Sequence, residues 1–143
     1  MAVWLGGLIV IDFVETPARF RVRGLGRNQV VAVGRAVFAA FNRTEAVVGA
    51  LLVTASTLLV TRAGADSYRS VAAVTAVGLM WLVALAQFFW ARPRMSAVTE
   101  GLDFEDRYRE DARLYALRRW HKTYVALDFL KLTLGLASLG LWA

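Results

Sequence analysis

The sequence contains no cysteine and a single histidine, His121. The absence of cysteine excludes disulfides, zinc–cysteine sites and thiol chemistry. One histidine is too few for a b-type haem held by two histidines. The methionines, Met1, Met80 and Met95, are too far apart in the chain to form the Met/His cluster of a copper site. We therefore expect no cofactor and no bound metal.

Recognisable catalytic groups are also lacking. No histidine lies at a readable spacing from Ser56, Ser70 or Ser138, so no nucleophile–base pair is evident. The segment Gly24-Leu-Gly26 is too short for a phosphate-binding loop and has no strand–helix context. We expect that the protein is not an enzyme.

Apolar residues, in contrast, are abundant. They make up 58% of the 143 residues, whereas a soluble domain has roughly 45–50%. The formal net charge is +6, but nearly all basic residues lie between or beside apolar runs, as they do in membrane proteins. We predict one membrane domain covering residues 1–143, in contact with the lipid bilayer and binding no nucleic acid.

Four apolar stretches are predicted to be membrane-spanning helices, because each is close to the length that crosses the hydrocarbon core. They cover about residues 2–20, 44–61, 71–91 and 123–142. We expect Arg92-Pro-Arg94 to end the third span, since proline interrupts the hydrogen bonds of a helix. The predicted fold class is all-α: an integral membrane bundle of four transmembrane helices.

Two segments between the spans are also predicted to be helical. Asn28 can cap a helix over residues 29–41, which either lies at the membrane interface or extends the second span. The hydrophilic residues 95–122 are expected to form an amphipathic cytoplasmic helix that continues into the fourth span. Two possible ion pairs, Glu105–Arg109 and Glu110–Arg113, support this helix. A narrow apolar edge also supports it, formed by Phe104, Tyr108, Ala112 and Tyr115.

The distribution of basic residues predicts the orientation. Residues 19–43 carry six Lys/Arg, residues 62–69 carry two, and residues 92–122 carry eight. Because the loops richest in Lys/Arg stay in the cytoplasm, the first and third loops are predicted to be cytoplasmic. Both termini would then lie outside the cytoplasm, and the expected location is a cell membrane, specifically the bacterial inner membrane.

The last apolar stretch carries a regular polar stripe. The stripe follows steps of three and four residues, which places it on one face of a helix: His121, Tyr124, Asp128, Lys131, Gly135, Ser138 and Trp142. An ionised group that faces hydrocarbon costs at least ~2.5–3.5 kcal/mol. We therefore expect this face to point toward other helices.

Ionisable residues in the spans suggest a polar network inside the bundle. The candidates are Asp12, Glu15, Tyr124, Asp128 and Lys131, with His121 at the start of the last span. In one interpretation, Glu15–Arg19 and Asp128–Lys131 are local ion pairs. In the other, which we favour for the lysine, Lys131 reaches Asp12 or Glu15 of the first helix. The acids and Tyr124 could also form a proton or cation path.

Short motifs resemble those of a family of small four-span membrane proteins, known as the domain of unknown function 4149 or transmembrane-protein-205-like family. They are Trp4-Leu-Gly-Gly7, Pro17-Ala-Arg-Phe20, Val37-Phe38, Arg92-Pro-Arg94, His121 and Leu127-Asp128-Phe-Leu130. After the histidine, the family tends to have a small hydroxyl residue and an asparagine, whereas this chain has Tyr124 and Asp128. The resemblance implies the four-span fold but no known reaction.

Two classes of function remain. The favoured one is a non-catalytic accessory or assembly subunit that packs against a larger membrane complex, such as a respiratory or photosynthetic one. The alternative is a small oligomeric transporter or channel that uses the intramembrane acids. It requires self-association, because four helices alone leave little room for a pore.

Overall fold

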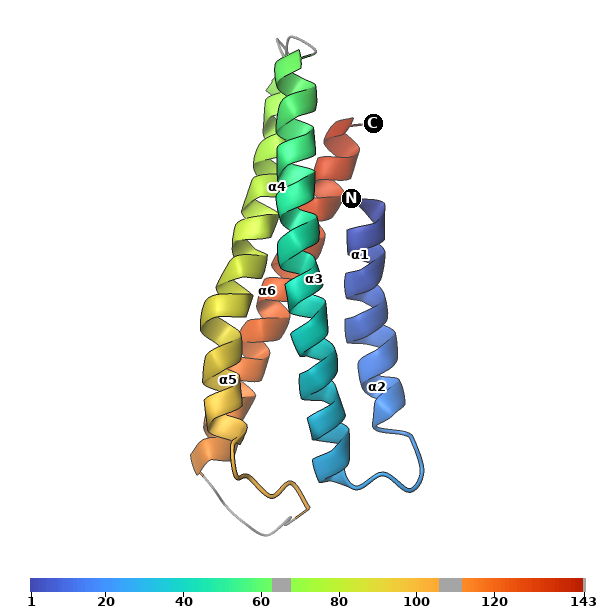
Figure 1. Cartoon of the computed structure of the whole chain (residues 1–143), viewed down its shortest axis with the longest axis vertical. Helices are drawn as coiled ribbons and strands as arrows, with labels where there is room; N and C mark the ends of the chain where they lie inside the picture. The colour runs from blue at the N-terminus through green and yellow to red at the C-terminus, as the bar shows by residue number, and fades with distance from the viewer. Residues whose placement is uncertain (63–67, 106–111, 143) are drawn as a thin grey trace.

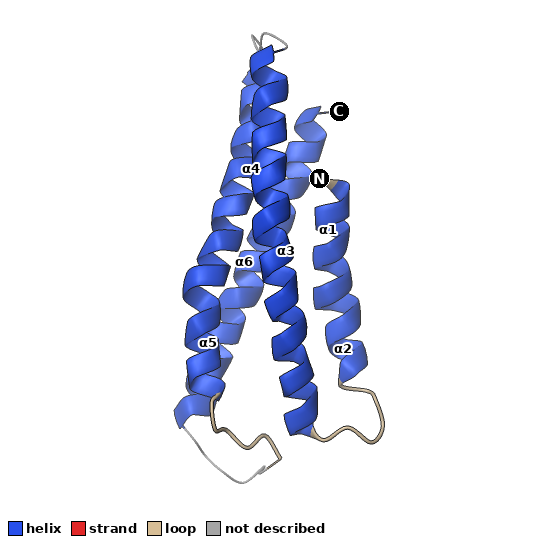
Figure 2. Cartoon of the chain, in the orientation of Figure 1, coloured by secondary structure: helices blue, strands red, loops and turns tan. Residues whose placement is uncertain are grey.

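The computed structural model of the chain describes residues 1–62, 68–105 and 112–142, and within these ranges the regular structure is entirely helical (Figures 1 and 2). The helices form four columns that run alternately up and down. Their elements are α1 (Ala2–Ile9), η1 (Val10–Glu15) and α2 (Thr16–Arg19); α3 (Arg27–Arg62); α4 (Tyr68–Ala86), η2 (Gln87–Ala91) and α5 (Arg92–Thr99); and α6 (Ala112–Trp142).

Three of the columns are long and apolar enough to cross a membrane: Arg27–Arg62, Tyr68–Thr99 and Ala112–Trp142. The first column, residues 2–19, is not among them, because three charged side chains interrupt it: Asp12, Glu15 and Arg19. Three columns of membrane-spanning length are therefore established, and a fourth span is not.

Both prolines lie inside helical columns, just after a π-helical segment. The π-helix η1 precedes Pro17, and η2 precedes Pro93. Proline has no N–H and its ring clashes with the carbonyl four residues earlier, and a wider π turn accommodates this disruption. The prediction that Arg92-Pro-Arg94 ends the third helix is wrong, because the helix continues through α5 to Thr99.

The second column is a single helix. Residues 29–41 belong to α3 and extend the second span toward its N-terminal end, which is one of the two predicted alternatives. With 36 residues, α3 is ~54 Å long at ~1.5 Å per residue. It therefore exceeds the ~30 Å hydrocarbon core and leaves about half of its length for the interface and the solvent.

The first and third loops lie at the same end of the bundle (Figure 1), which we call the basic end. The Asn28 side chain joins them: its Nδ2 donates to Asp103 Oδ1 at 2.8 Å, and its Oδ1 accepts from the Phe104 N–H at 2.8 Å. The predicted helix-capping role of Asn28 is therefore wrong. Gln29 Oε1 instead accepts the N–H of Gly26, just before α3.

The predicted amphipathic helix is shorter than expected. Helix α5 ends at Thr99, and residues 100–105 are not helical, so residues 95–122 do not form one helix. Residues 112–122 belong to α6, which continues into the predicted fourth span as expected. The proposed partners Tyr108, Arg109 and Glu110 lie outside the described residues.

Glycine allows close helix contacts around the first column. Gly49 of α3 packs against the rings of Trp4 and Trp81, and Gly135 of α6 packs against Leu5. An added Cβ would collide with the facing side chain at either glycine. Small residues thus let these helices approach one another closely, as is usual in membrane bundles.

Candidate functional site

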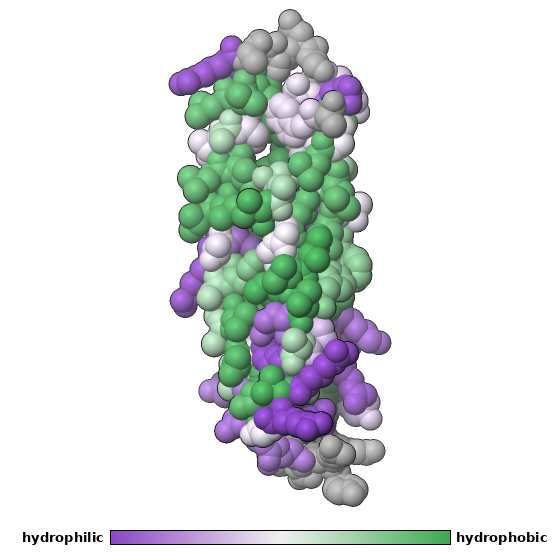
Figure 3. Space-filling model, turned by 90° about the vertical axis from the view of Figure 1, so that its right-hand side faces the viewer, coloured by the Kyte–Doolittle hydropathy of each residue, from purple (hydrophilic) through white to green (hydrophobic). Residues whose placement is uncertain are grey.

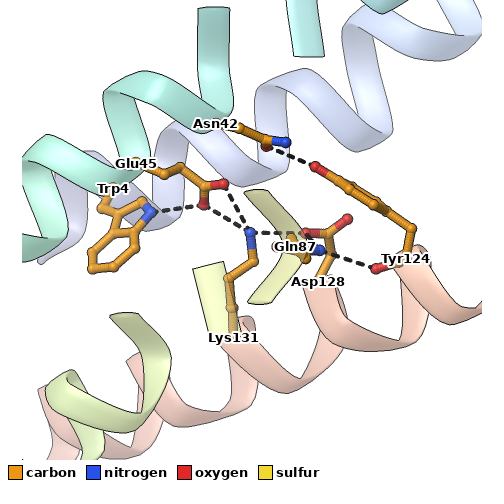
Figure 4. A network of polar contacts seen from close by, with 7 residues as sticks. All are labelled: Trp4, Asn42, Glu45, Gln87, Tyr124, Asp128 and Lys131. Carbon is orange, nitrogen blue, oxygen red and sulfur yellow. Dashed lines mark hydrogen bonds and ion pairs between the residues drawn. The ribbon is translucent and has the colours of Figure 1, made fainter. Parts of the chain in front are cut away.

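A network of buried polar side chains lies inside the bundle and joins all four columns (Figure 4). At its centre is Lys131 of α6, which is fully buried. Its Nζ donates to Glu45 of α3, at 2.7 Å from Oε1 and 3.0 Å from Oε2, and lies 2.9 Å from Asp128 Oδ1. One ammonium group therefore bridges two carboxylates on different helices.

The other columns complete this polar network. Trp4 Nε1 donates to Glu45 Oε1 at 2.9 Å, so the first column joins α3. Gln87, in η2, donates from Nε2 to Asp128 Oδ1 at 2.9 Å and to the Tyr124 carbonyl at 3.2 Å. The Tyr124 hydroxyl donates to Asn42 Oδ1 of α3 at 2.7 Å.

The buried face of α6 was predicted correctly over most of its length. The buried residues of α6 are Tyr124, Asp128, Lys131, Gly135 and Ser138, all members of the predicted stripe. The ends of the stripe, His121 and Trp142, are exposed instead. The spacing of polar residues therefore identified the face that packs against other helices.

Of the predicted site residues, the structure brings Tyr124, Asp128 and Lys131 together. His121 is exposed at the start of the stripe and has no place in the polar network. Glu15 forms the predicted local ion pair with Arg19, at 3.1 Å between Oε2 and NH2. The Asp128–Lys131 pair is also present, but the prediction that Lys131 contacts Asp12 or Glu15 is wrong, since its second acid is Glu45.

Asp12 lies beside the network without bonding to it. It is within electrostatic range of Asp128, Lys131 and Glu45. Its buried Oδ2 has no hydrogen-bond partner among the described residues. Asp12 therefore adds a third carboxylate to a region that has a single lysine, but it forms no hydrogen bond or ion pair with the network.

Arg19 occupies a separate buried position nearer the basic end. The side chain is 7% exposed. Its guanidinium packs against Gly34 of α3, where an added Cβ would collide with it, and lies 6.0 Å from the centre of the Phe38 ring. Gly34 thus makes the space for the Arg19 guanidinium, while its partner Glu15 stays partly exposed.

Three polar members of the network, and the role of Glu45, were not predicted from the sequence. Glu45 was not among the predicted site residues, because a second span that begins at residue 44 puts it at a helix end. In a helix that starts at Arg27, Asn42, Glu45 and Gly49 follow at steps of three and four, as a buried face should. Asn42 and Gln87 were not assigned to the site, and Trp4 was noted only as part of a motif.

The network has more acids than bases and some unused bonding capacity. Asp12, Glu45 and Asp128 surround one lysine, and the buried Gln87 Oε1 and Asn42 Nδ2 have no hydrogen-bond partners among the described residues. A buried charge is costly unless it is paired.

No group of three His, Asp or Glu residues in the described parts of the chain could hold a metal ion.

The polar network does not extend through the whole bundle. Beyond Glu45 and Lys131, away from the basic end, the buried residues are small or apolar: Ala73, Ala76, Val77, Met80, Gly135 and Ser138. Ser138 is the polar member of this set, and its hydroxyl donates to the Ala73 carbonyl at 3.3 Å. Within the described residues, the buried charges therefore stop partway along the bundle.

Comparison with known proteins gives a family and no further relative. The model of the family "Domain of unknown function (DUF4149)" matches residues 1–102. The motifs from Trp4 to Arg94 lie within that match, whereas His121 and the segment from Leu127 to Leu130 lie beyond it. No curated protein and no solved structure matches the chain.

Proposed function

The chain belongs to the family of the domain of unknown function DUF4149, and we propose that it is a four-span membrane protein that acts as a non-catalytic subunit of a larger membrane assembly. In this proposal residues 2–19 form the remaining span. Both termini lie outside the cytoplasm, and the basic end faces the cytoplasm of a bacterial cell.

The charges of the first column are compatible with a span, because they face the interior or are paired. Arg19 is buried and bonds to Glu15, and Asp12 Oδ2 is buried beside the polar network. Charged residues in membrane helices are tolerated on such inward faces. In Figure 3 the surface is mostly hydrophobic along its length, and hydrophilic residues gather mainly toward the basic end, with a smaller number at the other end.

The observation that carries the subunit proposal is the sealed interior. The buried charges reach only partway along the bundle, and small and apolar residues fill the rest of its core. Within residues 1–62, 68–105 and 112–142, a single bundle offers no continuous polar route from one end to the other. Its function would then be exerted through its outer surface, in contact with other membrane chains.

One part of that surface suits a neighbouring helix. A groove of about 620 Å³ runs between α3 and α4, over Ala46, Ala50 and Thr54 and beside Trp81. Small residues four apart let a second membrane helix approach closely. Leu51, which is 65% exposed, forms one wall of this groove and is well placed to report on a neighbour.

A photo-crosslinking residue at position 51, used in intact membranes, tests the subunit proposal. We expect a crosslinked product with a different membrane chain that also co-purifies in stoichiometric amount in mild detergent. The matched control is position 136, an exposed leucine of α6 at 63% exposure, which should give less product. A monomer with no crosslinked product at either position would overturn the proposal.

Proton or cation movement is the second candidate, and the surplus of carboxylates favours it. Three acids against one lysine in a buried region favour the uptake of positive charge. This activity would require self-association to complete a path. It predicts proton flux in liposomes that contain only this protein, and loss of that flux in Asp12→Asn. Liposomes without flux would exclude this candidate.

A further inference from the structure

An arginine lies against two tryptophans at the basic end of the bundle. The Arg94 guanidinium of α5 lies 4.8 Å from the centre of the Trp90 ring and 5.6 Å from that of Trp120. The two rings meet edge to face, with their centres 5.0 Å apart. We call Trp90, Arg94 and Trp120 the Trp–Arg cluster. It joins the third column to α6.

Arg94 retains most of its hydrogen-bonding capacity. Its NH1 donates to the Trp90 carbonyl at 3.3 Å, with no other hydrogen bond and no carboxylate partner among the described residues. A guanidinium has five N–H donors, so most remain available. The side chain is exposed, and its contacts with the two rings hold the guanidinium beside them.

The position of the cluster along the helices matches a membrane interface. Trp90 follows Gln87 of the polar network by three residues, and Trp120 precedes Tyr124 by four, so the cluster lies about one turn closer to the basic end. Tryptophan is enriched where the hydrocarbon meets the headgroups. Trp90, which contacts the cation, is 45% exposed, and the neighbouring residue in the chain, Phe89, is 71% exposed, so both add apolar surface to this part of η2.

We propose that the Trp–Arg cluster binds the phosphate of an anionic phospholipid headgroup. The free Arg94 donors bind the phosphate oxygens, since a guanidinium fork matches the geometry of a phosphate. The exposed Trp90 and Phe89 rings contact the glycerol and upper acyl chain, which a free phosphate ion does not have. This site is separate from the groove between α3 and α4 and does not depend on a protein partner.

Native mass spectrometry of the delipidated protein, titrated with phosphatidylglycerol and with phosphatidylcholine, tests this proposal. We expect preferential binding of phosphatidylglycerol and about a fivefold loss of its affinity in Arg94→Gln. The matched control, Arg23→Gln, removes the same charge from an exposed position in the first loop and should change the affinity less than twofold. Phosphatidylcholine has the same phosphate but a choline cation that offsets its charge, so it should bind more weakly and lose less affinity in Arg94→Gln than phosphatidylglycerol does.

A second variant and a competitor separate the parts of the proposal. Arg94→Lys keeps the charge but loses the planar fork, so it should recover only part of the affinity. Inorganic phosphate at millimolar concentration should not displace the lipid. Equal losses in Arg94→Gln and Arg23→Gln, full recovery by lysine, or displacement by phosphate would each overturn the proposed site.

Discussion

The two halves of the bundle are held together by different means. In the half toward the basic end, charged and polar side chains of different columns bond to one another, with Lys131 between Glu45 and Asp128 as the centre. In the other half, the hydroxyl groups of Ser56 and Thr75 bond to carbonyls of their own helix, whereas that of Ser138 donates to Ala73 of a neighbouring helix. There the helices pack through small and apolar residues.

The boundary between the two halves coincides with the end of the first column. Trp4 lies beside Glu45, so the first column accompanies α3 only up to that level, and α3 and α4 continue past both termini (Figure 1). In lipid, helices associate through close packing and interhelical hydrogen bonds, because apolar contact with lipid is as favourable as apolar contact with protein. Polar contacts in this bundle are thus concentrated where all four columns meet.

The largest effect is expected from Lys131→Leu. The substitution leaves Glu45 and Asp128 buried without their shared counter-charge, which typically costs ~3–5 kcal/mol. Denaturant unfolding in detergent micelles measures this loss. The control is Lys122→Leu, nine residues earlier on the same helix and exposed, where a change within about 0.5 kcal/mol is expected. Similar losses of unfolding free energy in both variants would show that Lys131 is not held by buried charges.

A smaller loss is expected from Gln87→Leu. The substitution removes the donor to Asp128 and to the Tyr124 carbonyl, and a hydrogen bond to a charged group is worth about 1.5–3 kcal/mol. In the apolar half, Thr75→Val removes a hydroxyl that bonds only to Val71 of its own helix and should be nearly neutral. The same unfolding assay compares the two, and equal losses would show that polar contacts matter alike in both halves.

The packing between columns is tested by Gly49→Ala, where the added Cβ would collide with Trp81 and Trp4. Overpacking of this kind costs about 1–3 kcal/mol. Gly78→Ala is the matched control, because nothing lies within 4 Å of a Cβ at that helical glycine. It should leave stability unchanged or raise it by up to ~1 kcal/mol. Stabilisation by both changes would refute the close contact of Trp4 and Trp81 with α3.

The smallest effect on stability, and the clearest on topology, is expected from single cysteines at Tyr68 and Ser96. Both positions are exposed, and the native chain has no cysteine to interfere. In intact cells, an impermeant thiol reagent should label the cysteine at 68 from outside and the one at 96 only after permeabilisation. Labelling of both from the same side would rule out the proposed membrane arrangement.

Local regularities were predictable from the sequence, and contacts between distant segments were not. The spacing of Tyr124, Asp128 and Lys131 alone identified the buried face of α6. The continuity of α3 was left open, and Pro93 was taken for a helix end because a compensating π turn leaves no clear signal in one sequence. A single sequence also does not reveal which acid contacts a buried lysine, since nothing in the sequence distinguishes Asp12, Glu15 and Glu45 as partners of Lys131.

The choice of Glu45 as the partner of Lys131 is best tested by a double-mutant cycle. Lys131→Met and Glu45→Gln, alone and together, should show a coupling energy of about 0.5–3 kcal/mol. The reason is that the double variant removes both charges of the Lys131–Glu45 pair, whereas each single variant leaves one of them without the other. The parallel cycle of Lys131→Met with Asp12→Asn should show a smaller coupling. Strong coupling to Asp12 together with none to Glu45 would contradict the polar network that joins α3 to α6.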